Sequence, residues 1–499
     1  MSLTLAELTA SGLPAGDQRP WPRLAADADT WQAAIEGLWT GSLSLSGLWT
    51  EPGAVHMALT DSLRGGLAVL SLDCPDGRYP SVGATHAPAI RLERAIHDLT
   101  GVVAEGAHDR RPWLDHGRWT AAPPGRAPTP APGPYAFLPV DGESLHQIAV
   151  GPIHAGIIEP GHFRFTANGE TVVRLEARLG YAHRGLHARL LGAGVETAAR
   201  LAGRASGDST VAYAVAFARA AEAALGTEAP PRAHWLRGLM AELERLANHI
   251  GDIGAISNDA SFAIMHAHCG VLRETILRAC DAAFGHRLMM DRAVPGGVAV
   301  DLTPEGEAAL RAALKAVAAR FPLLVDLYDD TASLQDRTVG TGVVPAALAR
   351  GFAAGGFVGR ACGRAYDARR ACPYPPYDVL DFEVPVREEG DVNARVWVRI
   401  EEVRQSLALA RRLLDGLPAG EIRRDLPAVA GEGVALVEGF RGDVLVWLRL
   451  EGGAVSAASL RDPSWFHWPL LEACIEGNIV ADFPLCNKSF NCAYAGVDL

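Results

Sequence analysis

The chain has 499 residues, which is too many for one compact domain and predicts two to four domains at roughly 100–200 residues each. Hydrophobic residues make up 49% and charged residues 21%, so the chain can bury a large core and is not disordered. The formal charge of −12 argues against nucleic acid as a partner, because phosphate binding needs a basic surface. We find neither an apolar run of the roughly 20 residues that span a bilayer nor a secretory signal. The sequence predicts a cytoplasmic chain that can dock on a membrane complex.

Cysteine usage favours a reducing compartment. The eight cysteines are scattered and none forms a C-x-x-C pair. Cysteines of this kind are mostly reduced, buried, small apolar side chains. The eight positions are Cys74, Cys269, Cys280, Cys362, Cys372, Cys474, Cys486 and Cys492.

A proline-rich segment separates two domains. Residues 122–134 read APPGRAPTPAPGP, and proline fixes φ and removes backbone donors, so this stretch is expected to be an extended, semi-rigid linker. We predict an α+β fold with four parts: a flexible arm (1–25), a small α+β domain (26–120), the linker (121–140), and a mainly helical domain with antiparallel hairpins (141–499).

Periodicity predicts the individual elements. In the first domain, helices are expected at Trp31–Trp39 and Ile90–Leu99, and strands at Ala54–Leu59 and Gly66–Leu72. In the second domain, Asn168-Gly169 predicts a hairpin, and strand-like alternation returns at Val434–Leu450 around Arg441-Gly442. Helices are expected at Val211–Leu225, Arg232–Ile256, Val271–Phe284, Pro304–Asp329 and Val403–Leu417.

Three segments carry chemistry or an unusual composition. The loop GPIHAGIIEPGHFRF (151–165) places His154, Glu159 and His162 where they could relay protons or bind a polar ligand; a solvated surface loop is the alternative. In the polar turn 203–209, Asp208 or Ser209 is expected to cap the following helix. The tail 462–499 is apolar and aromatic, so it is expected to be buried.

Eight motifs occur in an order that resembles a known family. The chain is similar to the fused large subunit of energy-converting, membrane-bound [NiFe] hydrogenases of the formate-hydrogenlyase and hydrogenase-4 type, and to the homologous 49-kDa-type subunit of respiratory complex I. The segment RYPSVGATHAPAIRLERAIHDLTGV resembles the 30-kDa-type subunit of complex I. The motifs are GPIHAGIIEPGHFRF, LGYAHRGL, AELERLANHIGDIGAISND, GHRLMMDRAVPGGV, LQDRTVGTG, YDARRACPYPPYD, GDVNARVWVRIEEVRQS and FPLCNKSFN.

The resemblance also marks where the chain departs from a hydrogenase. In that family two C-x-x-C pairs hold nickel and iron through four thiolates, which are soft, deprotonated donors. The first pair falls on Ser206 and Ser209, the second falls on Ala493 and Gly496, and Cys492 is displaced by one position. The resemblance therefore implies that the chain holds no nickel–iron centre and no other bound metal.

The complex I comparison is also partial. His162 matches the histidine that meets the quinone headgroup, Asp252 matches its supporting carboxylate, and Glu159 matches a glutamate that conducts protons in hydrogenases. The matching tyrosine position holds Gly207, although Tyr213 is near in sequence. We expect His154, Glu159, His162, Arg204 and Asp252 to line one cavity, in which Asp252 favours a protonated His162.

The resemblance implies a peripheral subunit at the cytoplasmic face of the inner membrane. Its expected partners are an iron–sulfur small subunit carrying a nearby [4Fe-4S] cluster and antiporter-like subunits of the membrane arm, and its expected acceptor is a quinone or an unknown compound. No G-x-G-x-x-G follows a strand, so NAD is not expected to bind. Two alternatives stay open: a true hydrogenase with atypical ligands, and a non-catalytic scaffold.

Overall fold

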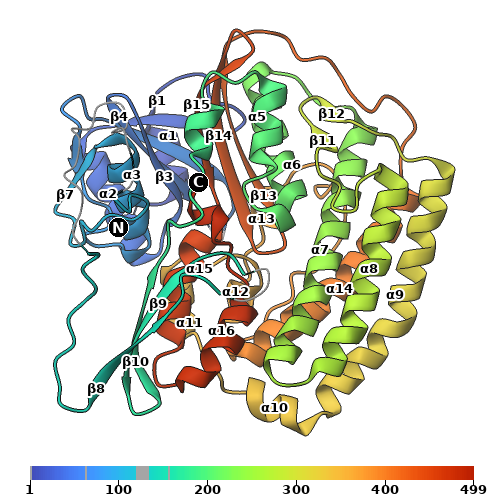
Figure 1. Ribbon diagram of the computed structural model, residues 1–499. Coiled ribbons are helices and arrows are strands. Elements are labelled where there is room, and N and C mark those ends of the chain that lie inside the picture. Colours follow the sequence, from blue (N-terminus) through green and yellow to red (C-terminus); the bar gives the residue numbers. More distant parts are fainter. Residues whose placement is uncertain (1–2, 62–63, 118, 120–133, 155–157) are drawn as a thin grey trace.

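The computed structural model describes residues 3–61, 64–117, 119, 134–154 and 158–499. It confirms the α+β class (Figure 1). An N-terminal sheet with its helices lies beside the C-terminal sheet, and long helices run side by side at the opposite end of the molecule (Figure 1).

The N-terminal part is a five-stranded sheet in the order β1-β2-β5-β4-β3. The predicted helices and strands of this part are present, each within three residues of its expected bounds. The flexible arm predicted at 1–25 is wrong for the residues described, because α1 buries Leu5 and Leu8, and β2 pairs in parallel with β5. The elements are α1 (Leu5–Ser11), β1 (Leu13–Pro14), β2 (Arg23–Ala26), α2 (Ala28–Thr40), β3 (Ser44–Glu51), β4 (Ala54–Thr60), β5 (Leu67–Asp73), β6 (Arg78–Pro80), α3 (Ile90–Thr100) and β7 (Val103–Glu105).

Most of the predicted linker, residues 120–133, lies outside the described residues, and 134–140 form no helix or strand. A three-stranded antiparallel sheet follows, made of β8 (Leu145–Val150), β9 (His162–Asn168) and β10 (Thr171–Arg178). The turn between β9 and β10 confirms the Asn168-Gly169 hairpin, where Gly169 has a φ of +57°.

Long helices form the body of the second domain. The neighbours α7 and α14 bury charged as well as apolar side chains between them. Helix α14 begins eleven residues before its predicted start, where Asp391 accepts a hydrogen bond from the Ala394 N–H at 2.7 Å. The buried arginines Arg395 and Arg399 interrupt the apolar periodicity there, which explains the missed start.

The helices and short strands of this region are α4 (Leu186–Leu190), α5 (Val195–Ala202), α6 (Thr210–Leu225), α7 (Pro231–Asp259), α8 (Ala263–Phe284), β11 (Ala293–Val294), β12 (Gly297–Val298), α9 (Pro304–Asp330), α10 (Ala332–Thr338), α11 (Ala346–Gly351), α12 (Gly356–Arg360), α13 (Ala368–Ala371) and α14 (Val392–Asp415). None of the helices among the described residues is both long and apolar enough to cross a bilayer.

The C-terminal sheet and tail complete the core. Strands β13 (Gly431–Glu438), β14 (Asp443–Glu451) and β15 (Ala454–Arg461) form an antiparallel sheet that packs on α6. The tail then forms α15 (Ser464–Cys474) and α16 (Phe483–Phe490). Its last aromatic and aliphatic side chains are buried, as predicted, and include Phe490, Tyr494 and Leu499.

Candidate functional site

The polar turn after α5 lies at the N-terminus of α6. Ser206 donates to Asp208 at 2.9 Å, so the carboxylate turns away from the helix that it was expected to cap. Ser209 occupies the N-cap position of α6, as expected, but its side chain makes no capping hydrogen bond. The Glu244 carboxylate from α7 instead accepts hydrogen bonds from the N–H groups of Val211 (2.7 Å) and Ala212 (3.1 Å), which satisfies two free donors of the helix end.

A buried arginine fills the space between this turn and the C-terminal tail. Arg441, from the turn between β13 and β14, donates through Nη1 to Asp208 (2.7 Å), Ser209 (3.0 Å) and Ser206 (3.4 Å). Its Nε donates to the carbonyl oxygen of Asn491 at 2.5 Å. Burial opposes ionisation of Asp208, but the Arg441 charge outweighs it and holds the pKa of Asp208 below its usual value.

These contacts test whether a nickel–iron centre fits. The two serine hydroxyls that stand at the first ligand pair point at a guanidinium, which is itself a cation. At the second pair, Ala493 has no donor atom, and a Cβ added to Gly496 would lie 2.5 Å from an oxygen of Asp462. Burial raises the pKa of Cys492 far above its usual value, so that thiol stays protonated. The donor set does not fit the metal centre.

His162 begins strand β9 and is mostly buried. Its Nδ1 donates to the carbonyl oxygen of Gly151 (3.2 Å), its Nε2 accepts from Arg164 (3.3 Å), and its ring packs on Phe137 at a centroid distance of 5.2 Å. Burial lowers the pKa of His162, so the ring is neutral near pH 7. His154 lies in the same loop, where its Nε2 hydrogen-bonds the carbonyl oxygen of Gly161 at 2.8 Å.

Asp252 is held by groups other than His162. Its Oδ2 accepts from the Arg399 Nε (3.1 Å) and its Oδ1 accepts from the Asn491 amide (2.9 Å). The predicted His162–Asp252 pair, with a protonated imidazole, is therefore absent from the structure. The carboxylate reaches the C-terminal tail and α14 from a position seven residues before the end of α7.

Arg204 also lies apart from the others. Its guanidinium forms a two-point ion pair with Asp291, at 2.6 and 2.7 Å, and 41% of its side chain is exposed. The predicted role of Arg204 in offsetting buried carboxylates of the cavity is wrong, because its partner is this separate surface carboxylate.

The C-terminal tail connects two of the predicted site residues. Glu159 accepts a hydrogen bond from the Ala495 N–H at 3.0 Å, and Asn491 contacts both Asp252 and Arg441. The structure thus brings Glu159, Asp252 and the 206–209 turn against one tail segment. Residues 155–157 of the first loop lie outside the described part.

Sequence reasoning missed Arg441, Arg399 and Asn491. Arg441 was interpreted only as part of the break between two strands, and a single arginine in a turn carries no signal of burial. The sequence around Arg399 likewise gives no sign that this helical arginine is buried. Buried arginines are uncommon, so one that the structure shows usually marks an ion pair.

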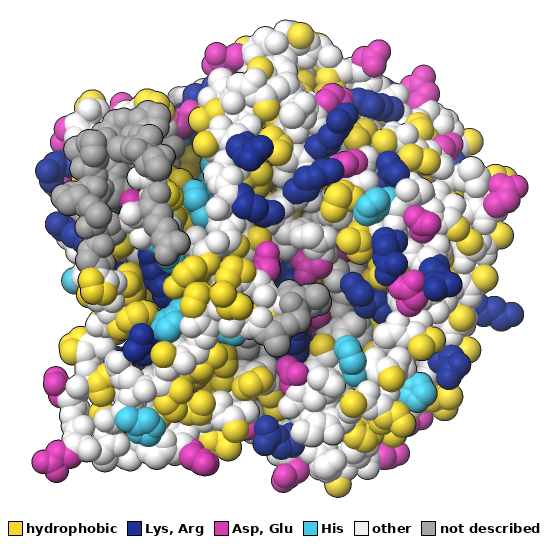
Figure 2. Space-filling model, viewed as in Figure 1, with side chains coloured by type: hydrophobic (Ala, Val, Ile, Leu, Met, Phe, Trp, Pro, Cys, Tyr) yellow, Lys and Arg dark blue, Asp and Glu magenta, His cyan; other side chains and the backbone are white. Residues whose placement is uncertain are grey.

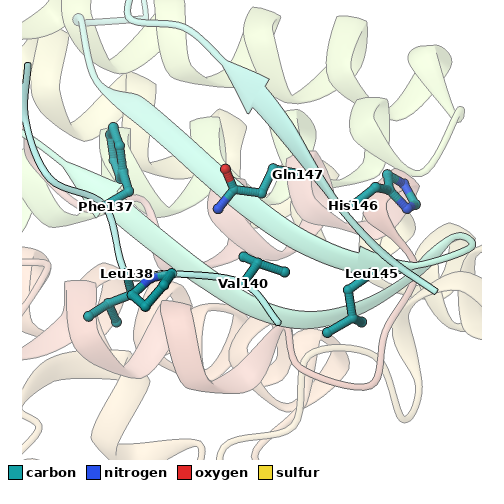
Figure 3. A pocket seen from close by; sticks show the side chains of 7 residues that line it. Phe137, Leu138, Val140, Leu145, His146 and Gln147 are labelled. Carbon is teal, nitrogen blue, oxygen red and sulfur yellow. The ribbon is translucent and has the colours of Figure 1, made fainter. Parts of the chain in front are cut away.

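Two pockets lie beside these residues. A pocket of about 340 Å³ follows strand β8, and Figure 3 shows Phe137, His146 and Gln147 among its side chains. Phe137 joins this pocket to His162 through the ring contact above. A larger cavity, of about 1490 Å³, opens between the N-terminal domain and β15, and includes His183, His187 and Trp465.

The surface around β8–β10 is rich in apolar side chains (yellow at the lower left of Figure 2). Ile153, Ile158 and Leu138 are exposed there. In the part of the chain that the structure describes, no three His, Cys, Asp or Glu side chains are arranged to hold a metal ion.

Comparisons with known proteins identify the family. Residues 259–430 match the family model described as the respiratory-chain NADH dehydrogenase 49 Kd subunit. The chain is 31% identical to the carbon monoxide-induced hydrogenase of Rhodospirillum rubrum, over 70% of this chain and 98% of that protein. It is 33% identical to an NADH-quinone oxidoreductase component of Roseiflexus sp. (strain RS-1), with the same two coverages. It is 29% identical to formate hydrogenlyase subunit 5 of Escherichia coli, over 86% of this chain and 78% of that protein.

A solved structure is also similar. One polypeptide of the membrane-bound sulfane sulfur reductase, an archaeal respiratory membrane complex, matches with a TM-score of 0.68 and 27% identity, over 72% of this chain and all of that one. The fold and the site thus define a large subunit of the hydrogenase and complex I type. The chain belongs to the family of complex I 49-kDa-type subunits and the related large subunits of group 4 hydrogenases.

Proposed function

We propose that this chain is the large subunit of a membrane-bound, complex-I-like oxidoreductase that works without a nickel–iron centre. It receives electrons from a [4Fe-4S] cluster of a partner subunit and passes them to an acceptor such as a quinone, and the reaction is coupled to ion translocation in the membrane arm.

The observation that carries this proposal is the Arg441 guanidinium between the two ligand positions of the first pair. Ser206 and Ser209 both lie within hydrogen-bond distance of it, and the backbone oxygen of Asn491, in the C-terminal tail, accepts a hydrogen bond from its Nε. A metal centre in the same place would have to displace the Arg441–Asp208 ion pair, and the two serine hydroxyls that contact Arg441 cannot replace thiolate ligands.

The residues that remain can bind and orient an uncharged acceptor. His162 is neutral and held by backbone and Arg164 contacts, and Phe137 offers a ring face beside it. Glu159 accepts the Ala495 N–H on the same tail, and we assign it to the proton route that leads to the reduced acceptor.

The proposed location is the cytoplasmic face of the inner membrane, as a peripheral subunit. The apolar surface around β8–β10 would then contact the partner subunits, an iron–sulfur small subunit and antiporter-like membrane subunits.

The test is the intact complex, purified through a tag on this chain. We expect iron and sulfide from the partner, no stoichiometric nickel, and reduction of a short-chain quinone by a chemically reduced donor. Hydrogen evolution with nickel present would establish the hydrogenase alternative instead. An active complex whose turnover is unchanged by His162→Ala and Glu159→Gln would establish the scaffold alternative.

A further inference from the structure

A closed cluster of charged side chains lies behind the candidate site. It contains four carboxyl groups, three guanidinium groups and one imidazole, and every one of these residues is at most 2% exposed. Helices α7, α12 and α14, the α13 segment and strand β13 contribute them. The members are Glu242, Arg245, His249, Arg360, Asp367, Arg369, Glu402 and Glu438.

Arg369 organises one half of the cluster. It donates to Asp367 through Nε (3.0 Å) and Nη2 (2.7 Å), and to Glu242 through Nη1 (2.9 Å). Glu242 also accepts from Tyr377 (2.6 Å) and Ser406 (2.5 Å). Asp367 and Glu242 therefore each accept several hydrogen bonds, which stabilise their charged forms.

Arg360 organises the other half. It reaches Glu402 through Nε (2.8 Å) and Nη2 (2.6 Å), and Glu438 through Nη1 (2.9 Å). His249 hydrogen-bonds Glu402 at 2.6 Å. Arg245 lies between the halves, 3.5 Å from Glu242 and 3.7 Å from Glu402, and donates to the backbone oxygen of Glu438 at 2.9 Å.

Among the eight members of this cluster, carboxyl groups outnumber guanidinium groups by one. Four carboxylates face three guanidiniums, so a neutral His249 leaves one negative charge over. An uncompensated charge in a buried site is strongly unfavourable, and such a group takes up a proton instead. A proton on His249 or on one of the four carboxyl groups would remove this imbalance; the buried Arg364 guanidinium nearby offsets it only at longer range, because it donates to the Ala354 carbonyl oxygen and not to a carboxyl group.

The surroundings of His249 disfavour an additional proton on its imidazole ring. Its Nδ1 is buried without a hydrogen-bond partner, and the ring packs against Phe357 and Phe440. Burial lowers the pKa of His249, even though Glu402 opposes this effect. A second N–H on this ring would point into apolar surroundings.

Glu438 has the weakest support for a negative charge. Apart from the Arg360 Nη1, its carboxyl group accepts only the Ala368 N–H, at 2.9 Å. Burial and the neighbouring Asp367 charge raise the pKa of Glu438 to about 7. Asp367 differs: although burial opposes its ionisation, Arg369 holds its pKa at about 2.

Charged groups outside the cluster also face Glu438. Asp443, which is paired with Arg461, favours the protonated form, and Arg245 and Arg360 favour the carboxylate. Arg364 is nearby but donates to the Ala354 carbonyl oxygen at 2.8 Å and lies over the Tyr366 ring. On the neighbouring part of α7, Glu244 faces the α6 N-terminus instead.

We propose that Glu438 is a proton-binding site of this subunit, which holds one exchangeable proton three residues from Arg441 on the same hairpin. A change of charge at the Arg441 site would then change the occupancy of this proton, because both groups lie in one low-dielectric core. This inference goes beyond the proposed function, since it does not depend on the identity of the electron acceptor.

Infrared difference spectroscopy of the intact complex tests it. Between acidic and alkaline pH we expect the carbonyl stretch of a protonated, buried carboxyl group to disappear with a midpoint near 7. Glu438→Gln should remove this band. The matched control, Glu244→Gln, changes a buried carboxyl group on α7 whose pKa burial raises to about 8; it should remove a separate band with that midpoint and leave the Glu438 band in place. Burial also raises the pKa of Asp498 to about 7, so the readout is the part of the band that Glu438→Gln removes; a band of unchanged intensity in that variant would overturn the assignment.

Thermal unfolding gives a second, independent measurement. Glutamine is neutral, as the protonated acid is, so Glu438→Gln should lower the melting temperature less than Glu402→Gln, which removes a carboxylate that Arg360 and His249 both need. If Glu438→Gln fails to fold, or lowers the melting temperature as much as Glu402→Gln does, the fold requires a charged Glu438 and the proposal is wrong.

Discussion

The Arg441 guanidinium and the Asp208 carboxylate form a two-point ion pair between the β13–β14 turn and the turn before α6. The pair joins segments 233 residues apart in the sequence. It also fixes the two serines at the first ligand pair, because Nη1 of Arg441 contacts both hydroxyl groups. In this protein a side-chain cation, with its counterion, stands among the positions that would hold a metal.

Nickel is therefore not expected in the purified complex. We predict well below one nickel per chain, because two serines, an alanine and a glycine supply none of the four thiolates that the centre needs. Elemental analysis of the intact complex measures this directly. Restoring only the first pair, with Ser206→Cys and Ser209→Cys, should not create a centre, since the second pair stays without donors. About one nickel per chain in the unmodified complex would contradict the prediction.

The Asp252–Arg399 pair should contribute much more to stability than the Arg204–Asp291 pair. Arg399 is fully buried, so Asp252→Ala leaves an unpaired buried charge and should cost about 3–5 kcal/mol. Arg399 also lies 3.6 Å from the centre of the Phe357 ring. Because this contact partly stabilises the unpaired guanidinium, the loss of unfolding free energy should lie toward the lower end of that range. Asp291→Asn is the control: asparagine tolerates the left-handed backbone there (φ +61°), the partner Arg204 is 41% exposed, and the expected cost is about 0–1 kcal/mol. Chemical denaturation measures the free energy of unfolding of both variants, and equal losses would contradict this prediction.

The regular elements were predictable because their signals are local. Asn168-Gly169 alone placed the hairpin, and the apolar face of α7 placed that helix to within three residues at each end. Elements that bury charge were harder to predict. The start of α14 was missed because Arg395 and Arg399 stand where an apolar residue was expected, and their partners are residues distant in the sequence.

The site was predicted only in part, for the same reason. The resemblance located His162, Asp252 and the serine turn, but a motif does not say which carboxylate meets which cation. Asp252 was assigned to His162, whereas the structure gives it to Arg399 and Asn491. Pairing of this kind depends on how α14 and the tail pack against α7, and no short stretch of sequence encodes it.

His162 should titrate below its usual range, and independently of Asp252. Burial lowers the pKa of His162, and its contacts are with Gly151, Arg164 and Phe137. Nuclear magnetic resonance of histidine-labelled protein should therefore show a midpoint below about 6.5 that Asp252→Asn does not move. Because the folded-state pKa is lowered, the folded state binds fewer protons than the unfolded state. The stability that this group contributes is present above the unfolded value and is lost as the pH falls from about 6.5 through the folded-state pKa. A raised midpoint, or one that falls in Asp252→Asn, would restore the direct pairing.

Truncation after Pro484 should abolish folding or assembly. The removed segment carries five large side chains that are buried in the described structure, and exposing each costs roughly 1.5–3 kcal/mol. They are Leu485, Phe490, Tyr494, Val497 and Leu499. Their sum is comparable with the whole stability of a folded domain, about 5–15 kcal/mol. The truncation also removes Asn491, which holds Asp252 and Arg441, and the Ala495 N–H that binds Glu159. Circular dichroism melting and co-purification of the partner subunits measure the two outcomes. An unchanged melting temperature with normal assembly would contradict the prediction, because it would show that burying these side chains adds nothing to stability.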